Sequence, residues 1–328
     1  MLAIPSSRRH APEAALVLAL ICLALAARLL PGQRIVDDAY ITFRYARNLV
    51  RGAGFVYNPG EPVLGTTTPL YTLLLATLAA ASGSQDFLAL AVAANAAFGA
   101  GSVGLLYLLA KRFAGHAAPA AALAGLWALA PYSVTFAIGG METDLTVLLL
   151  LGCAYAHILR RPRWLAVLSG LALLARPDTA LLLALLWLDL ALRPGRRPWR
   201  GLPWREAMIT LVVLTPWLIF SLITFGSPLP RSIMAKSAAY RLPPAASALR
   251  LLQHYATPFF EDKVLPPLGV VVAFALYCGL AALGGLHGLR RDRSTWPLLA
   301  YPFVYFAAFA FANPLLFRWY LSPPLPFY

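Results

Sequence analysis

Two adjacent carboxylates, Asp37 and Asp38, stand between the first apolar segment of the chain and a polar stretch rich in glycine and tyrosine. One carboxylate would be enough to cap the helix predicted from residue 39, because a single side-chain acceptor satisfies the free amides there. Two carboxylates beside a membrane also suit general-base chemistry or the binding of a cation. The sequence therefore predicts a catalytic or cation-binding pair, with Asp37 preferred because Asp38 is the better cap.

A second group of acids lies in the segment GGMETDL, where Glu142 and Asp144 begin the helix predicted over 143–159. Acids at this position favour the positive end of the helix dipole, so they could serve the helix alone or form a second acidic motif. Arg176 and Asp178 occupy the turn between two short apolar segments. They could form a structural ion pair or belong to a binding site.

Three basic residues could neutralise a phosphate group. Arg231 and Lys236 lie in FGSPLPRSIMAK, and Arg318 lies in FRWYLSPPLP. All three fall at helix ends on the predicted outer side, where the positive-inside rule does not call for positive charge. Charge-assisted contacts from arginine and lysine are the usual way to hold a phosphate, which makes these residues candidates for binding a phosphate group.

The predicted first outer loop, residues 36–71, contains further candidates for binding a ligand. They are Tyr40, Arg44, Tyr57 and Thr67, and Tyr71 could add another stacking surface. The tyrosines are equally plausible as residues of the aromatic belt at the membrane interface. The helix predicted over 39–51 is amphipathic and is expected to lie in that interface.

The apolar composition requires a membrane protein. Of the 328 residues, 60% are hydrophobic and only 12% are charged, and no single soluble core could bury so much apolar surface. The predicted fold is an all-α polytopic transmembrane bundle with about 9–10 crossings plus re-entrant or interfacial helices in the first outer loop. The apolar runs span 13–31, 68–82, 87–110, 117–134, 143–159, 164–175, 179–192, 206–225, 267–289, 297–312 and 314–328.

The net charge of +14 follows from topology, because the basic residues cluster in short loops between apolar runs. Nucleic acid is therefore not an expected partner. Placing these clusters in the cytoplasm puts Asp37 and Asp38 outside and Lys111 inside, which requires an odd number of crossings between them. The short run at 68–82 is thus predicted to be re-entrant. A second long outer loop is predicted over 226–265.

Five segments, in this order, resemble the bacterial GT-C glycosyltransferases, and in particular proteins similar to terminal β-(1→2)-arabinofuranosyltransferases of actinobacterial cell walls. They are DDAYITFRYARNLVRGAGFVYNPGEPVLGTTTPLY, GMET, ARPD, FGSPLPRSIMAK and FRWYLSPPLP. The resemblance implies that an essential acidic motif falls on Asp37 and Asp38, and that a second acid falls on Glu142 or Asp144. The chain departs from the common family pattern at GTTTPLY and at PLPRS.

The resemblance implies a glycosyltransferase that moves a sugar, for example a pentose such as arabinofuranose, from a polyprenyl-phosphate donor. On this resemblance, the donor phosphate would be bound by Arg231, Lys236 and Arg318. The sugar or the acceptor would be bound by Tyr40, Arg44, Tyr57, Thr67, Arg176 and Asp178, with Tyr71 as a further surface on which a sugar could stack. The acceptor would be a glycan, lipid or protein of the cell envelope, on the extracytoplasmic side of the bacterial plasma membrane. Residues 1–328 would form one transmembrane domain, and since relatives usually continue through more helices, the chain is expected to be truncated at its C-terminus.

Asp37 and Asp38 could hold a magnesium, manganese or calcium ion, or Lys236 and Arg231 could neutralise the donor phosphate without a metal. A transporter or lipid-linked-sugar flippase is the alternative function, and a non-catalytic assembly subunit is a third. A transporter typically carries ionisable groups near the middle of the membrane and internal repeats. Here the acids gather at outer helix ends and no repeat is visible, which favours the enzyme.

Overall fold

The computed structural model describes residues 7–34, 36–193, 203–230, 232, 243–258, 266–312 and 317–328. These residues form α-helices and short 3-10 helices, with one isolated β-bridge between Asn58 and Glu61. The elements are α1 (Ser7–Leu29), α2 (Ala39–Val50), α3 (Pro69–Ser82), α4 (Phe87–Ala114), α5 (Ala117–Leu129), α6 (Pro131–Ile138), α7 (Thr143–Ile158), α8 (Pro162–Ala175), η1 (Pro177–Thr179), α9 (Ala180–Leu192), α10 (Trp204–Phe225), α12 (Pro244–Ala256), α13 (Pro267–Arg291), η3 (Arg293–Thr295), α14 (Trp296–Ala312), η4 (Arg318–Leu321) and η5 (Leu325–Phe327). The predicted all-α fold is confirmed.

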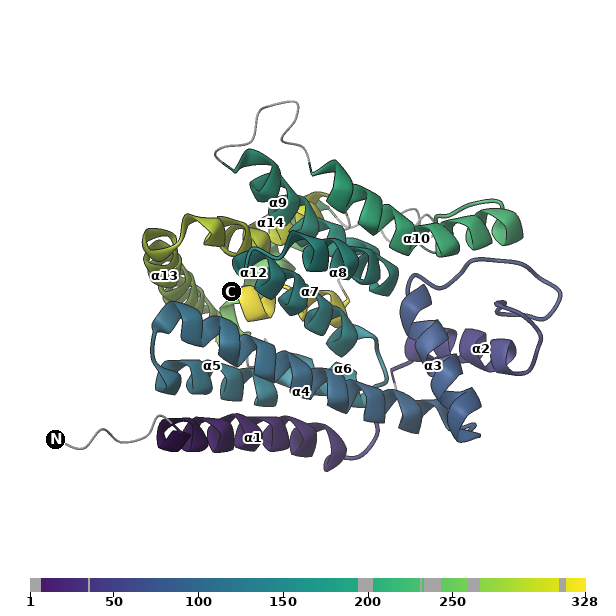
Figure 1. Cartoon of the computed structure of the whole chain (residues 1–328), viewed down its shortest axis with the longest axis horizontal. Helices are drawn as coiled ribbons and strands as arrows, with labels where there is room; N and C mark the ends of the chain where they lie inside the picture. The colour runs from purple at the N-terminus through teal and green to yellow at the C-terminus, as the bar shows by residue number, and fades with distance from the viewer. Residues whose placement is uncertain are drawn as a thin grey trace.

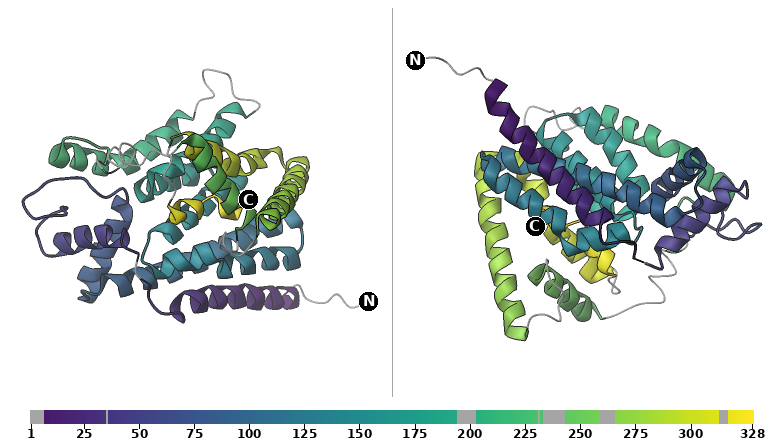
Figure 2. Two further views of the ribbon diagram at one scale, coloured as in Figure 1. Left: turned by 180° about the vertical axis from the view of Figure 1, so that it is seen from behind. Right: turned by 90° about the horizontal axis from the view of Figure 1, so that it is seen from below.

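The 28-residue helix α4 is the centre of one layer, where it packs against α1, α5 and α7 (Figure 1). Its buried side includes Ala91, Ala96, Gly99 and Ala100. Small residues let helix backbones approach closely, which is how helices associate in a membrane without a hydrophobic driving force. The amphipathic α2 and the short α3 lie together at one end of the protein, and α13 lies at the other end in both views of Figure 2.

Five segments of the described helices are long and apolar enough to cross a membrane, and the pair α5–α6, bent by 42°, could add a sixth. The five segments are Pro12–Leu29, Phe87–Ala114, Trp204–Phe225, Leu268–Arg291 and Arg293–Phe311. In α10 and α13 only 6% of the most apolar stretch is buried inside the protein, so these helices present leucine and valine side chains outward. The chain is a multi-pass membrane protein.

Three further apolar helices, α3, α7 and α8, have only 14, 16 and 14 residues. A helix of 14 residues is about 21 Å long, short of the roughly 30 Å of a hydrocarbon core. Because these short helices pack against longer ones, they can belong to the bundle without spanning the hydrocarbon core. The total of 9–10 crossings and the re-entrant character of α3 therefore stay predictions.

Of the expected apolar helices, one is not formed by the described residues and another is broken. The run at 314–328 is not a membrane-spanning helix, because its described part forms only η4 and η5. Pro323, Pro324 and Pro326 explain this, since a proline inside a helix removes a backbone donor and clashes with the preceding turn. The run at 117–134 is broken at Ala130, next to Pro131, into α5 and α6.

The topology can be tested with single cysteines at the two ends of α4. If α3 is re-entrant, Gln85→Cys should react with an impermeant thiol reagent added outside, and His116→Cys should be protected. Both positions are exposed in the structure, so protection would reflect the membrane rather than burial. The measurement is the fraction of each variant labelled in intact cells, before and after permeabilisation.

The background for this experiment replaces the three native cysteines, Cys22, Cys153 and Cys278, which are all free thiols. Labelling of both variants after permeabilisation is the control for reactivity. The reverse pattern, with His116→Cys labelled outside and Gln85→Cys protected, would mean that α3 crosses the membrane.

Candidate active site

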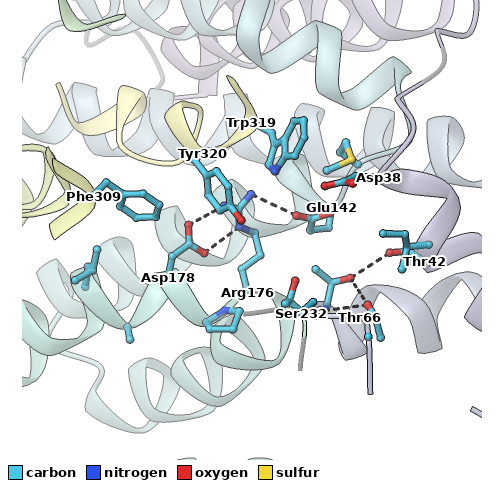
Figure 3. Close-up of a pocket in the computed structure, with 18 of the residues that line it drawn as sticks. Asp38, Thr42, Thr66, Glu142, Arg176, Asp178, Ser232, Phe309, Trp319 and Tyr320 are labelled. Carbon is cyan, nitrogen blue, oxygen red and sulfur yellow. Dashed lines mark hydrogen bonds and ion pairs between the residues drawn. The ribbon is translucent and has the colours of Figure 1, made fainter. Parts of the chain in front are cut away.

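A cavity of about 470 Å³ opens between segments that are distant in the sequence (Figure 3). Its walls come from α2, the loop before α3, the turn before α7, the turn around η1, the end of α14 and η4. Its polar lining includes Asp38, Thr42, Thr66, Glu142, Arg176 and Asp178. All five segments that carry the family resemblance therefore contribute residues to this cavity. The segment FGSPLPRSIMAK contributes Ser232.

Two glycines bring the turn before α7 against α2. Gly140 has a φ of +77°, which a glycine adopts without the steric penalty of a side chain. A Cβ atom at Gly139 would lie 2.4 Å from Val36 Cγ2, and one at Gly140 would lie 2.6 Å from the Phe43 ring. Only glycine permits this approach, which places Glu142 on the same cavity as Asp38.

Buried polar side chains on two other helices hold the same turn. Asn95 of α4 donates to the carbonyls of Ala137, at 3.0 Å, and Met141, at 2.8 Å. Tyr71 of α3 donates to the Asn95 side chain and to the Gly140 carbonyl, each at 3.3 Å. Tyr71 is 1% exposed, so its predicted use as a sugar-stacking surface is wrong. It positions the backbone that precedes Glu142 instead.

Arg176 links two acids in one buried network. Its guanidinium makes two bonds with Asp178, at 2.9 and 2.7 Å, and lies 3.3 Å from a Glu142 carboxylate oxygen. Tyr305 donates to Asp178 at 2.9 Å. Arg176 is 3% exposed, and a buried charge of this kind requires such partners. The predicted ion pair between Arg176 and Asp178 is thus present, and it lines the cavity.

Glu142 lies in the turn before α7 and is 7% exposed. Burial raises the pKa of its carboxyl group, Arg176 opposes that rise, and the negative charges of Asp178 and Asp38 add to it. The ionised form of Glu142 therefore depends on its ion pair with Arg176. Two carboxylates that influence each other across one cavity are a frequent arrangement at catalytic sites.

The two acids of the first motif differ in position. Asp38 is half-buried and lines the cavity, whereas Asp37 is exposed and does not line it. Asp38 occupies the cap position of α2, but its side chain makes no capping hydrogen bond. The Asp37 carboxylate accepts a hydrogen bond from the Asp38 backbone amide at 2.9 Å. This geometry favours Asp38, although the sequence alone prefers Asp37, and the catalytic role of either residue stays a prediction.

Asp144, the other half of the predicted second acidic motif, points away from the cavity. Its carboxylate pairs with Arg28 of α1 at 2.6 Å, and both side chains are buried. Arg28 also donates to Ser133 at 2.5 Å and lies against Gly99 of α4, where any side chain would collide with the guanidinium. Asp144 therefore connects helices, and Glu142 is the acid that this motif contributes to the cavity.

The remaining candidates divide between the cavity and its surroundings. Thr67 lines the cavity. Arg44 stacks on Tyr57, with the guanidinium carbon 4.3 Å from the ring centroid, and donates to the Tyr57 carbonyl at 2.8 Å, so this pair holds the loop that follows α2. Tyr40 is exposed and makes an edge contact with Phe43. Neither Tyr40, Arg44 nor Tyr57 lines the cavity.

Of the three predicted phosphate ligands, only Arg318 is among the residues that the structure describes. Arg318 is exposed and does not line the cavity, although its neighbours Trp319 and Tyr320 do. Arg231 and Lys236 lie outside the described residues, as does part of the predicted outer loop over 226–265. Within the described part of the chain, no group of three or more acidic, histidine or cysteine side chains could hold a metal ion. Asp37 and Asp38 do not face the cavity together, and a cation there stays a prediction.

Several cavity residues are absent from the sequence prediction. Thr66 and Thr68, on either side of the predicted Thr67, and the aromatic residues Phe309, Trp319 and Tyr320 all line it. The consecutive threonines of GTTTPL, in a loop shaped by glycine and proline, are a signal that could have indicated the first group. The aromatic residues carry no such signal, because aromatic residues are common throughout an apolar chain.

No family model matches the chain. The chain is 32% identical, over 232 residues, to a terminal beta-(1->2)-arabinofuranosyltransferase of Mycobacterium tuberculosis, a match that covers 62% of this chain and 35% of that protein. Its fold is similar to that of the crystal structure of ArnT from Cupriavidus metallidurans bound to undecaprenyl phosphate, with a TM-score of 0.58 and 16% identity. That likeness covers 98% of this chain and 59% of the ArnT chain.

The chain thus spans about a third of the length of the arabinofuranosyltransferase and about three fifths of the ArnT chain. The sequence match confirms the predicted resemblance to terminal β-(1→2)-arabinofuranosyltransferases. The structural match also confirms the predicted GT-C-like membrane fold.

Proposed function

We propose that the protein is a membrane glycosyltransferase that transfers a sugar from a polyprenyl-phosphate donor to a hydroxyl group of a cell-envelope acceptor. The observation that carries the proposal is the convergence of Asp38 and Glu142 on one cavity, in a chain with the fold of ArnT. A relative that is an arabinofuranosyltransferase supports a pentose such as arabinofuranose as the sugar. The undecaprenyl phosphate bound to ArnT supports a polyprenyl phosphate as its carrier.

In the proposed reaction Asp38 accepts the proton of the acceptor hydroxyl group as its oxygen attacks the anomeric carbon of the donor sugar. The bond between that carbon and the phosphate oxygen breaks, and polyprenyl phosphate leaves with the bonding electrons. Asp38 is the better placed acid, because it is half-buried and can meet an acceptor that enters from outside. A general base of this kind typically contributes a factor of about 10² to 10⁴ to the rate.

Glu142 and Arg176 lie deeper and would position the donor. Because Arg176 is already paired with Glu142 and Asp178, it brings no excess positive charge for the donor phosphate. That charge would come from Arg231 and Lys236, or from a divalent cation, and would stabilise the leaving phosphate. In this proposal the cavity opens on the extracytoplasmic face of a bacterial plasma membrane, an orientation that the basic clusters of the loops support.

The test is transfer by the purified protein of radiolabelled sugars from a panel of polyprenyl-phosphate donors to envelope glycans. The parent should transfer at least one sugar, and Glu142→Gln should lower kcat/KM by about 10-fold, since it removes one charge from a charge-assisted contact. The matched control is Glu61→Gln, an exposed acid of the first outer loop that does not line the cavity. A parent that transfers no sugar from any donor would overturn the proposal.

A further inference from the structure

Three threonine hydroxyl groups form a continuous cluster on one wall of the cavity. Thr42 belongs to α2, while Thr66 and Thr68 belong to the loop that precedes α3. The Thr42 and Thr68 oxygens lie 3.3 Å apart, and the Thr66 and Thr68 oxygens lie 3.2 Å apart. The three residues are only 6%, 3% and 4% exposed, yet all of them line the cavity.

The cluster cannot use all of its hydrogen-bonding capacity internally. Three hydroxyl groups carry three hydrogens, and the two oxygen–oxygen contacts can use at most two of them. The only other bond to these oxygens among the described residues is donated by the Thr68 backbone amide to Thr66, and it uses a lone pair. At least one hydroxyl hydrogen therefore remains for a molecule in the cavity.

A fourth hydroxyl group lies on the same cavity. The Ser232 oxygen is buried and has no hydrogen-bond partner among the residues that the structure describes. In Figure 3, Ser232, Thr66 and Thr42 lie on the Asp38 side, and Phe309 lies at the other end beyond Asp178. A buried polar atom without a partner costs free energy, so this wall is suited to a ligand that supplies donors and acceptors.

We propose that the cluster of Thr42, Thr66 and Thr68 is the subsite that binds the hydroxyl groups of the donor sugar and selects a neutral sugar. This inference rests on the proposed function and names its substrate class. A sugar hydroxyl both donates and accepts, as a threonine hydroxyl does, so the two can continue one chain of hydrogen bonds. A charged group on the sugar would lose its hydration against these threonines, which offer it only neutral hydroxyl groups.

The donor sugar fits this wall better than the acceptor does. The threonines are almost fully buried, and a single sugar unit can be enclosed in a cavity of about 470 Å³. A polymeric acceptor must instead reach the reaction from the exposed side, past Asp38. Thr42 follows Asp38 by four residues, about one turn of α2, so a sugar on the threonines would have its reacting carbon near that carboxylate.

The test compares Thr66→Val and Thr68→Val with the parent, because valine keeps the branched shape of threonine and removes its hydroxyl group. The donors are a polyprenyl-phosphate arabinofuranose and each of its monodeoxy analogues. The parent should prefer the complete donor over at least one analogue by about 10-fold or more in kcat/KM. Each valine variant should lose about three- to tenfold with the complete donor and little with that analogue, so the preference should shrink.

The matched control is Thr72→Val, a buried threonine on the next turn of α3, whose hydroxyl donates to the Thr68 carbonyl and does not line the cavity. This variant should keep the parent's preference. Equal losses with the complete and deoxy donors would make the threonines purely structural and overturn the inference, as would an unchanged preference in both cavity variants. A parent that transfers none of these sugars would overturn the arabinofuranose donor and this subsite together, whereas the first two results leave the proposed transfer reaction standing.

Discussion

Asp38→Asn is expected to lower glycosyl transfer by about 100-fold or more while the protein inserts and melts like the parent. Asparagine has the shape of aspartate but cannot accept a proton as a base. Asparagine also caps a helix about as well as aspartate does, so the start of α2 should survive the change. The measurement is kcat/KM for transfer from the preferred donor, together with the melting temperature in detergent.

Two acids of the same loop are matched controls for Asp38. Asp37→Asn changes an exposed carboxylate that does not line the cavity, and we expect at most a small loss of activity. Glu61 is also exposed, and it accepts a bond from Asn58, so Glu61→Gln should be tolerated. An Asp38→Asn variant as active as these controls would remove Asp38 from the reaction.

Asp144→Leu is expected to lower the free energy of unfolding by about 3–5 kcal/mol, the usual cost of leaving one partner of a buried ion pair without the other. Arg28 is 0% exposed and has no route to solvent, because its guanidinium lies against α4 at Gly99. It would keep only its bonds to Ser133 and to backbone carbonyls. Denaturation of the purified protein in mixed micelles measures the change.

The double variant Arg28→Met with Asp144→Leu should recover most of that loss, because replacing a buried pair by apolar side chains is often close to neutral. The more exposed ion pair between Lys111 and Glu13 is the control. Its side chains are 37% and 33% exposed, so Lys111→Ala should be nearly silent. An Asp144→Leu protein as stable as the parent would show that this ion pair does not hold α1 to α7.

Much of the fold follows from local properties of the sequence. The apolar runs locate nine of the described helices because a membrane requires long apolar segments with internally satisfied backbones. Prolines limit what apolar runs can predict about helices. The run at 314–328 contains enough apolar residues for a helix, yet its described part forms only two short 3-10 helices. Hydropathy counts side chains, whereas a helix also needs backbone donors that proline lacks.

For the site, the sequence by itself located the acidic motifs, and only the tertiary structure decided which acid of each motif reaches the cavity. Glu142 lies in the turn before α7 and lines the cavity, whereas Asp144 lies in the first turn of α7 and pairs with Arg28. Nothing in the neighbouring sequence says which of the two acids pairs with the buried Arg28. That choice depends on a guanidinium buried in α1, 116 residues away, and on the glycines that let the turn before α7 approach α2. Contacts between distant segments set these directions, and a pattern of neighbouring residues does not contain them.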